Sequence, residues 1–123
     1  MSEAPLPSEI QLHTQSRQLE LVYADKQYFL SAEYLRVYSP SAEVQGHGPG
    51  QEVLQLNKEK VGIANIEPVG HYAIKIYFDD GHDSGLFSWD YLYLLATEQE
   101  NRWQDYLSRL SAAGHRRHKE VIV

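Results

Sequence analysis

Cysteine is absent from this chain of 123 residues, and its absence excludes a whole class of chemistry. Without a thiol, the chain can form no disulfide, no thiolate metal site and no cysteine nucleophile. The chain also lacks an apolar run near the roughly 20 residues that a membrane helix needs. Its first residues, Met1 to Glu9, lack the basic and apolar blocks of a signal peptide, so we expect a cytoplasmic protein.

Positive charge is scarce too, since 11 lysines and arginines face 17 acidic residues and the formal net charge is −6. Nucleic acids and anionic membranes both attract basic surfaces, so we expect neither as a partner. A hydrophobic content of 42% is ordinary for a globular domain, and the length suits one domain. We expect a single domain over residues 9–114, a disordered lead-in over 1–8 and a flexible tail over 115–123.

Alternation of apolar and polar residues predicts antiparallel strands in the first two thirds of the chain. The predicted strands are 9–14, 18–24, 27–30, 52–56, 61–69, 72–78 and 84–87, with an irregularity near Ala64-Asn65. Ser31 is placed to cap a short helix over residues 32–38. The stretch 40–51 is rich in glycine and proline, which predicts a loop without regular structure.

The last third changes to a helical period. Ser88 is a suitable N-cap, and apolar residues recur at helical spacing from Trp89 onward. Residues 97–100 read Thr-Glu-Gln-Glu, a capping-box pattern that predicts the start of a second helix ending near Gly114. The sequence therefore predicts an α+β fold, with an antiparallel sheet or meander packed against two C-terminal helices.

The segment with the densest chemistry is residues 79–85, Asp-Asp-Gly-His-Asp-Ser-Gly, between an apolar strand and an apolar helix. Imidazole and carboxylate groups are ligands of zinc and of ferrous iron, so His82 and Asp80 are candidate metal ligands. An Asp-Gly pair is also a strong hairpin signal, and the spacing of His82 and Asp83 is not specific to metal sites. A purely structural turn therefore stays open.

His47 is a third candidate ligand. It lies between two glycines, which would let the backbone approach a bound group closely. The run is not a phosphate loop, because it lacks the lysine and the following serine or threonine. A mobile surface loop is the alternative.

Arg36 is an isolated cation beside an apolar helix face, where it could bind a carboxylate or pair with Glu33 or Asp90. The candidate interaction surface comprises Arg36, Gly46, His47 and Asp83. Four aromatic residues could form a cage for a quaternary ammonium ion, although helical spacing favours core packing for the two tryptophans. These four are Trp89, Tyr91, Tyr93 and Trp103.

Several short motifs, taken together, resemble one family. They are Leu35-Arg36-Val37-Tyr38-Ser39-Pro40-Ser41-Ala42-Glu43, Gly46-His47-Gly48, Ile66-Glu67-Pro68-Val69-Gly70, Phe78-Asp79-Asp80-Gly81-His82 and Ser88-Trp89-Asp90-Tyr91-Leu92. They are similar to the N-terminal domain of gamma-butyrobetaine hydroxylase, in the DUF971 family, over roughly residues 10–113. The resemblance implies a small α+β module.

In the hydroxylases this module precedes an oxygenase barrel and carries a structural zinc held by three cysteines and one histidine. The resemblance places His82 at the histidine, and Ser39, Ser41 and Val44 where the cysteines fall. Serine and valine do not replace thiolates on zinc, so that zinc is not expected here. The chain contains no barrel, so the resemblance carries over neither the iron triad nor the 2-oxoglutarate site.

A related domain is fused to P-loop ATPases of iron–sulfur cluster assembly, which implies a protein partner in that machinery. We therefore expect a non-catalytic accessory or interaction domain linked to iron–sulfur cluster or metal handling. The alternative is a zinc or iron protein that uses the Asp-Gly-His turn. A stand-alone enzyme ranks last, because no serine lies in a Gly-x-Ser-x-Gly elbow and no catalytic set stands out.

Overall fold

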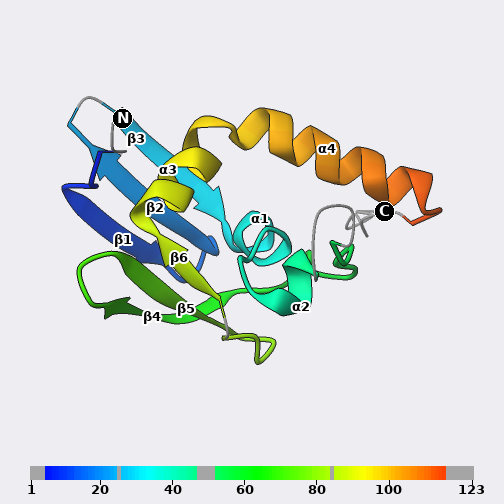
Figure 1. Ribbon diagram of the computed structural model, residues 1–123, viewed down its shortest axis with the longest axis horizontal. Helices are drawn as coiled ribbons and strands as arrows, with labels where there is room; N and C mark the ends of the chain where they lie inside the picture. Colours follow the sequence, from blue (N-terminus) through cyan, green and yellow to red (C-terminus); the bar gives the residue numbers. More distant parts are fainter. Residues whose placement is uncertain (1–4, 25, 47–51, 84, 116–123) are drawn as a thin grey trace.

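The computed structural model describes residues 5–24, 26–46, 52–83 and 85–115. The chain forms two three-stranded antiparallel sheets, three helices and one further helical turn (Figure 1). The first sheet contains β1 (Glu9–His13), β2 (Gln18–Tyr23) and β3 (Lys26–Ser31). The second contains β4 (Ile63–Val69), β5 (Ala73–Phe78) and β6 (Leu86–Ser88). The predicted α+β class is confirmed.

The second sheet is the predicted three-stranded meander, with β5 in the centre. Its register shifts between Ile63 and Asn65, at the irregularity that the sequence predicted. Alternate residues of β5 point into the core, since Ile74, Ile76 and Phe78 are all buried. This sheet places the turn between β5 and β6, which contains the Asp-Gly-His sequence, at one end of the meander.

Two helices begin where serine caps were predicted. Ser31 accepts a hydrogen bond from the Tyr34 N–H at the start of α1 (Ala32–Val37), which follows β3 directly. Ser88 accepts one from the Tyr91 N–H at the start of α3 (Trp89–Thr97). Such caps satisfy backbone donors that have no partner within the helix. Figure 1 shows α1 near the centre of the molecule and α4 (Gln99–Ala112) along one side of it.

The start of α4 corrects one prediction. Thr97 does not cap this helix, because it is the last residue of α3 and its hydroxyl donates to the carbonyl of Tyr93 over 2.9 Å. Glu98 takes the N-cap position instead and makes no capping bond with its side chain. At the other end, Gly114 follows the helix with a φ of 79°, as expected for a glycine that ends a helix.

Two further corrections concern the middle of the chain. A short helical turn, α2 (Ala42–Gln45), forms where no regular structure was expected, because the carbonyl of Ser41 accepts from the N–H groups of Val44 and Gln45. Residues 52–56 form no strand. Their backbone bonds to the α2 segment instead, since the Val53 N–H donates to the carbonyl of Val44 over 2.8 Å.

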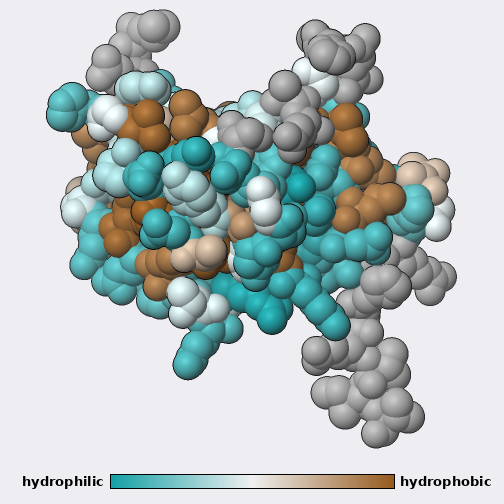
Figure 2. All heavy atoms as spheres, turned by 90° about the horizontal axis from the view of Figure 1, so that it is seen from below, coloured by the Kyte–Doolittle hydropathy of each residue, from teal (hydrophilic) through white to brown (hydrophobic). Residues whose placement is uncertain are grey.

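Both sheets and the helices share one hydrophobic core. Its fully buried members come from both sheets and from helices α1 and α3, and they include Leu19, Leu35, Ile76, Phe87 and Leu92. Within the described ranges, no helix combines the length and the apolar character needed to cross a bilayer. On the face shown in Figure 2, hydrophilic residues predominate and hydrophobic ones form separate patches. The predicted limits of the domain stay a prediction, because residues 1–4 and 116–123 lie outside the described part.

Candidate functional site

The candidate site lies where the end of α1 meets the turn between β5 and β6. The turn closes on itself, because the Phe78 N–H donates to the carbonyl of His82 over 3.0 Å. Gly81 has a φ of 90°, a left-handed conformation that costs a residue with a side chain more than it costs glycine. The Asp-Gly pair therefore forms a tight turn, and the turn aims the next side chain inward.

His82 is buried, with 6% of its surface exposed. Its Nε2 lies 2.9 Å from the hydroxyl oxygen of Ser39 and 3.2 Å from that of Ser41. Ser39 is fully buried and Ser41 nearly so. Buried polar groups are stable when they hydrogen-bond to one another. We call these three residues the Ser–His cluster, and it ties the segment after α1 to the turn after β5.

Gly85 completes the packing around this cluster. A Cβ built on Gly85 would lie 2.3 Å from the Oγ of Ser39 and 3.2 Å from the Cδ of Pro40. Real Cβ atoms do not approach other atoms that closely, so only glycine lets the chain just before β6 pass beside Ser39. The sequence Asp-Gly-His-Asp-Ser-Gly thus uses its second glycine for close packing.

Asp80 lies at the outer side of the same turn, and its carboxylate binds two cationic side chains. Its Oδ2 accepts from Arg36 Nε over 2.9 Å and from Lys58 Nζ over 3.0 Å, while its Oδ1 accepts from the His82 N–H over 3.1 Å. Arg36 also donates to the side-chain oxygen of Gln55 over 3.0 Å. Arg36 is 7% exposed, so the carboxylate of Asp80 compensates a nearly buried charge.

The charge state of Asp80 follows from these contacts. Partial burial raises the pKa of its carboxyl, but hydrogen bonds from Lys58, from the His82 N–H and from Arg36 outweigh burial and lower the pKa to about 2. Asp80 is therefore ionised near neutral pH. A carboxylate held in this way accepts hydrogen bonds and does not serve as a general acid.

The structure brings together three of the residues singled out by the sequence, namely Arg36, Asp80 and His82. Asp83 lies exposed at the surface, and Gly46 ends α2 with a φ of 75°. His47 lies outside the described residues. Arg36 forms an ion pair with Asp80, whereas the sequence had suggested Glu33 or Asp90. Lys58 and Gln55 were missed as well, since both come from a segment without a regular pattern.

The zinc of the hydroxylases does not fit the residues at this place. His82 Nε2 faces two hydroxyl groups, and Val44 offers no ligand atom. Neutral hydroxyls and an alkyl group do not replace the thiolates that bind zinc together with histidine. Elsewhere in the described chain, no three histidine, aspartate or glutamate side chains lie together closely enough to hold a metal ion.

The Ser–His cluster contains the atoms of a serine–histidine nucleophilic pair, but its burial argues against that role. Ser39 is 0% exposed and Ser41 is 6% exposed, so a substrate carbonyl has no path to either hydroxyl. A nucleophile has to reach the reacting atom before its pKa or its base matters. The cluster is therefore a structural connection between two segments.

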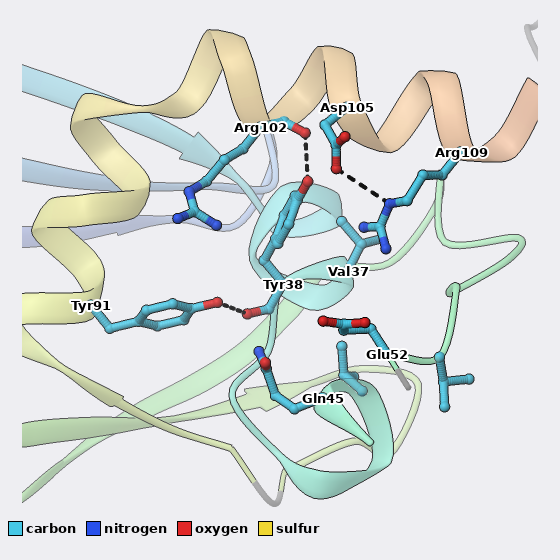
Figure 3. A pocket seen from close by; sticks show the side chains of 10 residues that line it. Val37, Tyr38, Gln45, Glu52, Tyr91, Arg102, Asp105 and Arg109 are labelled. Carbon is cyan, nitrogen blue, oxygen red and sulfur yellow. Dashed lines mark hydrogen bonds and ion pairs between the residues drawn. The ribbon is translucent and has the colours of Figure 1, made fainter. Parts of the chain in front are cut away.

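A pocket of about 460 Å³ lies beside this connection, between the α1–α2 segment and α4 (Figure 3). The Tyr91 hydroxyl donates to the carbonyl of Tyr38 over 2.5 Å, and the Tyr38 hydroxyl donates to the carbonyl of Arg102 over 2.6 Å. Burial raises the pKa of both tyrosines, so both hydroxyls remain protonated donors. These bonds fix one wall of the pocket.

The charges around this pocket are balanced. Its cations are Arg102 and Arg109, and its carboxylates are Glu52 and Asp105. Arg109 Nε lies 3.3 Å from Asp105 Oδ2. A dashed line marks this ion pair in Figure 3. Two charges of each sign give the pocket no clear preference for an anion or a cation, but they suit polar side chains of a protein.

The four aromatic residues proposed as a cage do not gather in one place. Trp89 donates its indole N–H to the carbonyl of His71, and Tyr93 packs edge-on against Tyr23. Trp103 packs against Tyr34 on α1 instead. Both tryptophans are partly buried against the core, as their helical spacing favoured.

Comparison with known proteins identifies relatives. The family model described as gamma-butyrobetaine hydroxylase-like, N-terminal, matches residues 10–93. A protein solved in solution by NMR is 56% identical, with a TM-score of 0.82, and the match covers 97% of this chain and 95% of that one. A second NMR structure is 48% identical, with a TM-score of 0.79, over 100% of this chain and 96% of the other.

A crystal structure is similar as well. It is that of a protein of unknown function of the DUF971 family from Acidithiobacillus ferrooxidans, 37% identical with a TM-score of 0.63. The match covers 76% of this chain and 94% of that protein. No curated protein matches the chain.

Proposed function

Because this chain belongs to the gamma-butyrobetaine hydroxylase-like N-terminal domain family, DUF971, we propose that it is a non-catalytic interaction domain and an accessory in iron–sulfur cluster or metal handling. Its partner is a protein of the iron–sulfur assembly machinery. The family resemblance supports this partner, since a related domain is fused to P-loop ATPases of that pathway.

The observation that carries the proposal is the Ser–His cluster. The residue with the greatest catalytic potential, His82, directs Nε2 at two buried hydroxyls. Asp80 is held by Arg36, Lys58 and a backbone N–H. The polar groups at this corner therefore hold three segments of chain together, which is what a rigid binding scaffold requires.

The surface beside this scaffold supports the binding of a protein. The pocket between α4 and the α1–α2 segment presents two arginines and two carboxylates next to Tyr38 and Tyr91. Arginine and tyrosine are enriched in the energetically important parts of protein interfaces. The wall is fixed by the hydrogen bonds of both tyrosines, so little ordering of this wall is needed on binding.

The test is a binding titration between the full chain and the P-loop ATPase of iron–sulfur assembly from the same organism, with and without its cluster. We expect saturable binding in calorimetry. The double variant Arg102→Ala with Arg109→Ala should weaken it at least about tenfold, or ~1.4 kcal/mol. The double variant Lys60→Ala with Lys75→Ala, at two lysines that do not line this pocket, is the control matched for the loss of two positive charges and should have little effect.

Absence of binding to both forms of the ATPase would contradict the proposed partner. The metal alternative has its own readout, a titration of the metal-free, isotope-labelled chain with zinc and with ferrous iron. Saturable shifts of the His82 imidazole and of the Asp80 and Gly81 amides, with the amide shifts lost in His82→Ala, would replace the interaction domain with a metal-binding protein.

A further inference from the structure

A second pocket, of about 660 Å³, lies where the junction of β3 and α1 meets the turn between α3 and α4. Aromatic rings form its walls, from Tyr28 on β3, Tyr34 on α1 and Trp103 on α4. The rings of Tyr34 and Trp103 lie 6.3 Å apart at an interplanar angle of 78°. Tyr34 is only 1% exposed, so the accessible aromatic surface of the pocket belongs to the partly buried rings of Tyr28 and Trp103.

The charged residues of this lining are both carboxylates. Glu33 is 6% exposed and lies in the first turn of α1, and Glu100 is exposed in the first turn of α4. No lysine or arginine of the described chain lines the pocket. A helix dipole accounts for an acidic residue at either position singly. It does not account for both carboxylates lining one aromatic cavity.

One aromatic wall already contacts a cation. Lys26 Nζ lies 5.9 Å from the centroid of the Tyr28 ring, although Lys26 is not part of the lining. That distance is within the range at which an ammonium group is attracted to the negative face of an aromatic ring. An ammonium group of the chain itself is therefore already accommodated beside this wall of the pocket.

We propose that this pocket binds a lysine side chain of a partner protein, an inference that rests on the proposed role as an interaction domain. The ammonium group lies near the exposed carboxylate of Glu100, and the alkyl stem packs on Trp103. A lysine combines a compact ammonium group for one exposed carboxylate with a long alkyl stem for the ring of Trp103. The net charge of −6 favours the approach of a basic segment.

The probe for this site is Nα-acetyl-lysine methylamide, titrated into the isotope-labelled full chain. We expect saturable shifts of the Trp103 indole N–H and of the Glu100 amide. The norleucine analogue has the same stem without the charge and should bind at least about fivefold more weakly. The indole N–H of Trp89, which donates to the carbonyl of His71, is an internal reference and should not move.

Glu100→Gln removes one carboxylate from the lining and should weaken binding of the lysine probe about fivefold. Glu98→Gln is the matched control, because Glu98 is in the same turn but pairs with Arg102 and does not line the pocket. Equal binding of both analogues, or an equal effect of both variants, would overturn the inference. Binding of tetramethylammonium without binding of the lysine probe would overturn it too, since it would indicate a site for small free cations.

The two proposals fail in different ways. If the ATPase binds but the lysine probe does not, the inference about this pocket fails and the interaction domain stands. If the probe binds at Trp103 but the ATPase does not, the named partner fails and the lysine site stands.

Discussion

The hydroxyl oxygen of Ser39 lies 2.9 Å from Nε2 of His82, although 43 residues separate the two in the sequence. This hydrogen bond joins the end of α1 to the turn after β5. In the hydroxylases that the chain resembles, a zinc ion makes the equivalent connection. Here hydrogen bonds between an imidazole and two hydroxyl groups make it.

Replacing His82 by alanine should destabilise the fold by about 1–3 kcal/mol, because two buried hydroxyls lose their shared partner. The measurement is the free energy of unfolding in urea, with and without a chelator. The loss should be the same in both conditions. His71→Ala, at an exposed turn, is the control and should stay within about 0.5 kcal/mol of the unsubstituted chain. A loss seen only without chelator would assign His82 to a metal.

Gly85→Ala should also destabilise the fold, by about 1–3 kcal/mol, because its Cβ would lie 2.3 Å from the Oγ of Ser39. The direct test is a double-mutant cycle with Ser39→Ala, measured by urea unfolding. Removing the hydroxyl relieves the closest contact, so the double variant should be more stable than the sum of the two losses predicts. Strict additivity would show that the close approach is not what makes glycine necessary.

Asp80 should make stability depend on pH in the acid range. Its folded-state pKa of about 2 lies below the ordinary value of 3.8, so the unfolded chain binds the proton more readily. The stabilisation is therefore fully present above about pH 4 and is lost as the pH falls through about 2. Because Asp80 lies at the surface, solvent screening limits the effect to about 1 kcal/mol.

The comparison that checks this is Asp80→Asn against the unsubstituted chain, unfolded in urea from pH 7 to pH 2. The difference in stability should be present at neutral pH and shrink toward zero at the acid end. Asp83→Asn, at an exposed neighbouring position, is the matched control and should show no such trend. A difference for Asp80→Asn that stays constant down to pH 2 would mean that its ion pairs contribute nothing.

Features set by a few neighbouring residues were predictable. The caps at Ser31 and Ser88 depend on one hydroxyl and an N–H three residues later, and both formed as predicted. The alternation of β5 likewise follows from adjacent residues that face opposite sides of one sheet. Local patterns of this kind fixed the class of the fold and the position of the Asp-Gly-His turn.

Features that depend on distant segments were not predictable from patterns. Lys58 reaches Asp80 from 22 residues away, out of a segment without regular structure, so no periodicity indicated the pair. The α2 turn was not predicted, because the glycines and prolines around its four residues indicated a loop. Only the family resemblance placed Ser39 and Ser41 beside His82, since nothing in their own sequence marks a partner for His82.

The family resemblance and the positions of the Ser–His cluster together predict that a zinc site can be built at this corner of the fold. Introducing three cysteines, Ser39→Cys, Ser41→Cys and Val44→Cys, should create a zinc site with His82. The oxygens of Ser39 and Ser41 already lie 2.9 and 3.2 Å from Nε2. Tetrahedral ligands at about 2.0–2.3 Å from zinc lie roughly 3.5 Å apart, so the cluster needs only a small expansion.

The triple variant should bind one equivalent of cobalt with the intense visible absorption of tetrahedral thiolate coordination, and zinc should displace it. Zinc should then raise its stability by several kcal/mol, because metal bound only by the folded state stabilises that state. The same triple variant with His82→Ala is the matched control and should bind the metal much more weakly. If all four positions together held no metal, the segment after α1 would not superimpose on the zinc-binding loop, and the alignment of Ser39, Ser41 and Val44 with the cysteines would be wrong.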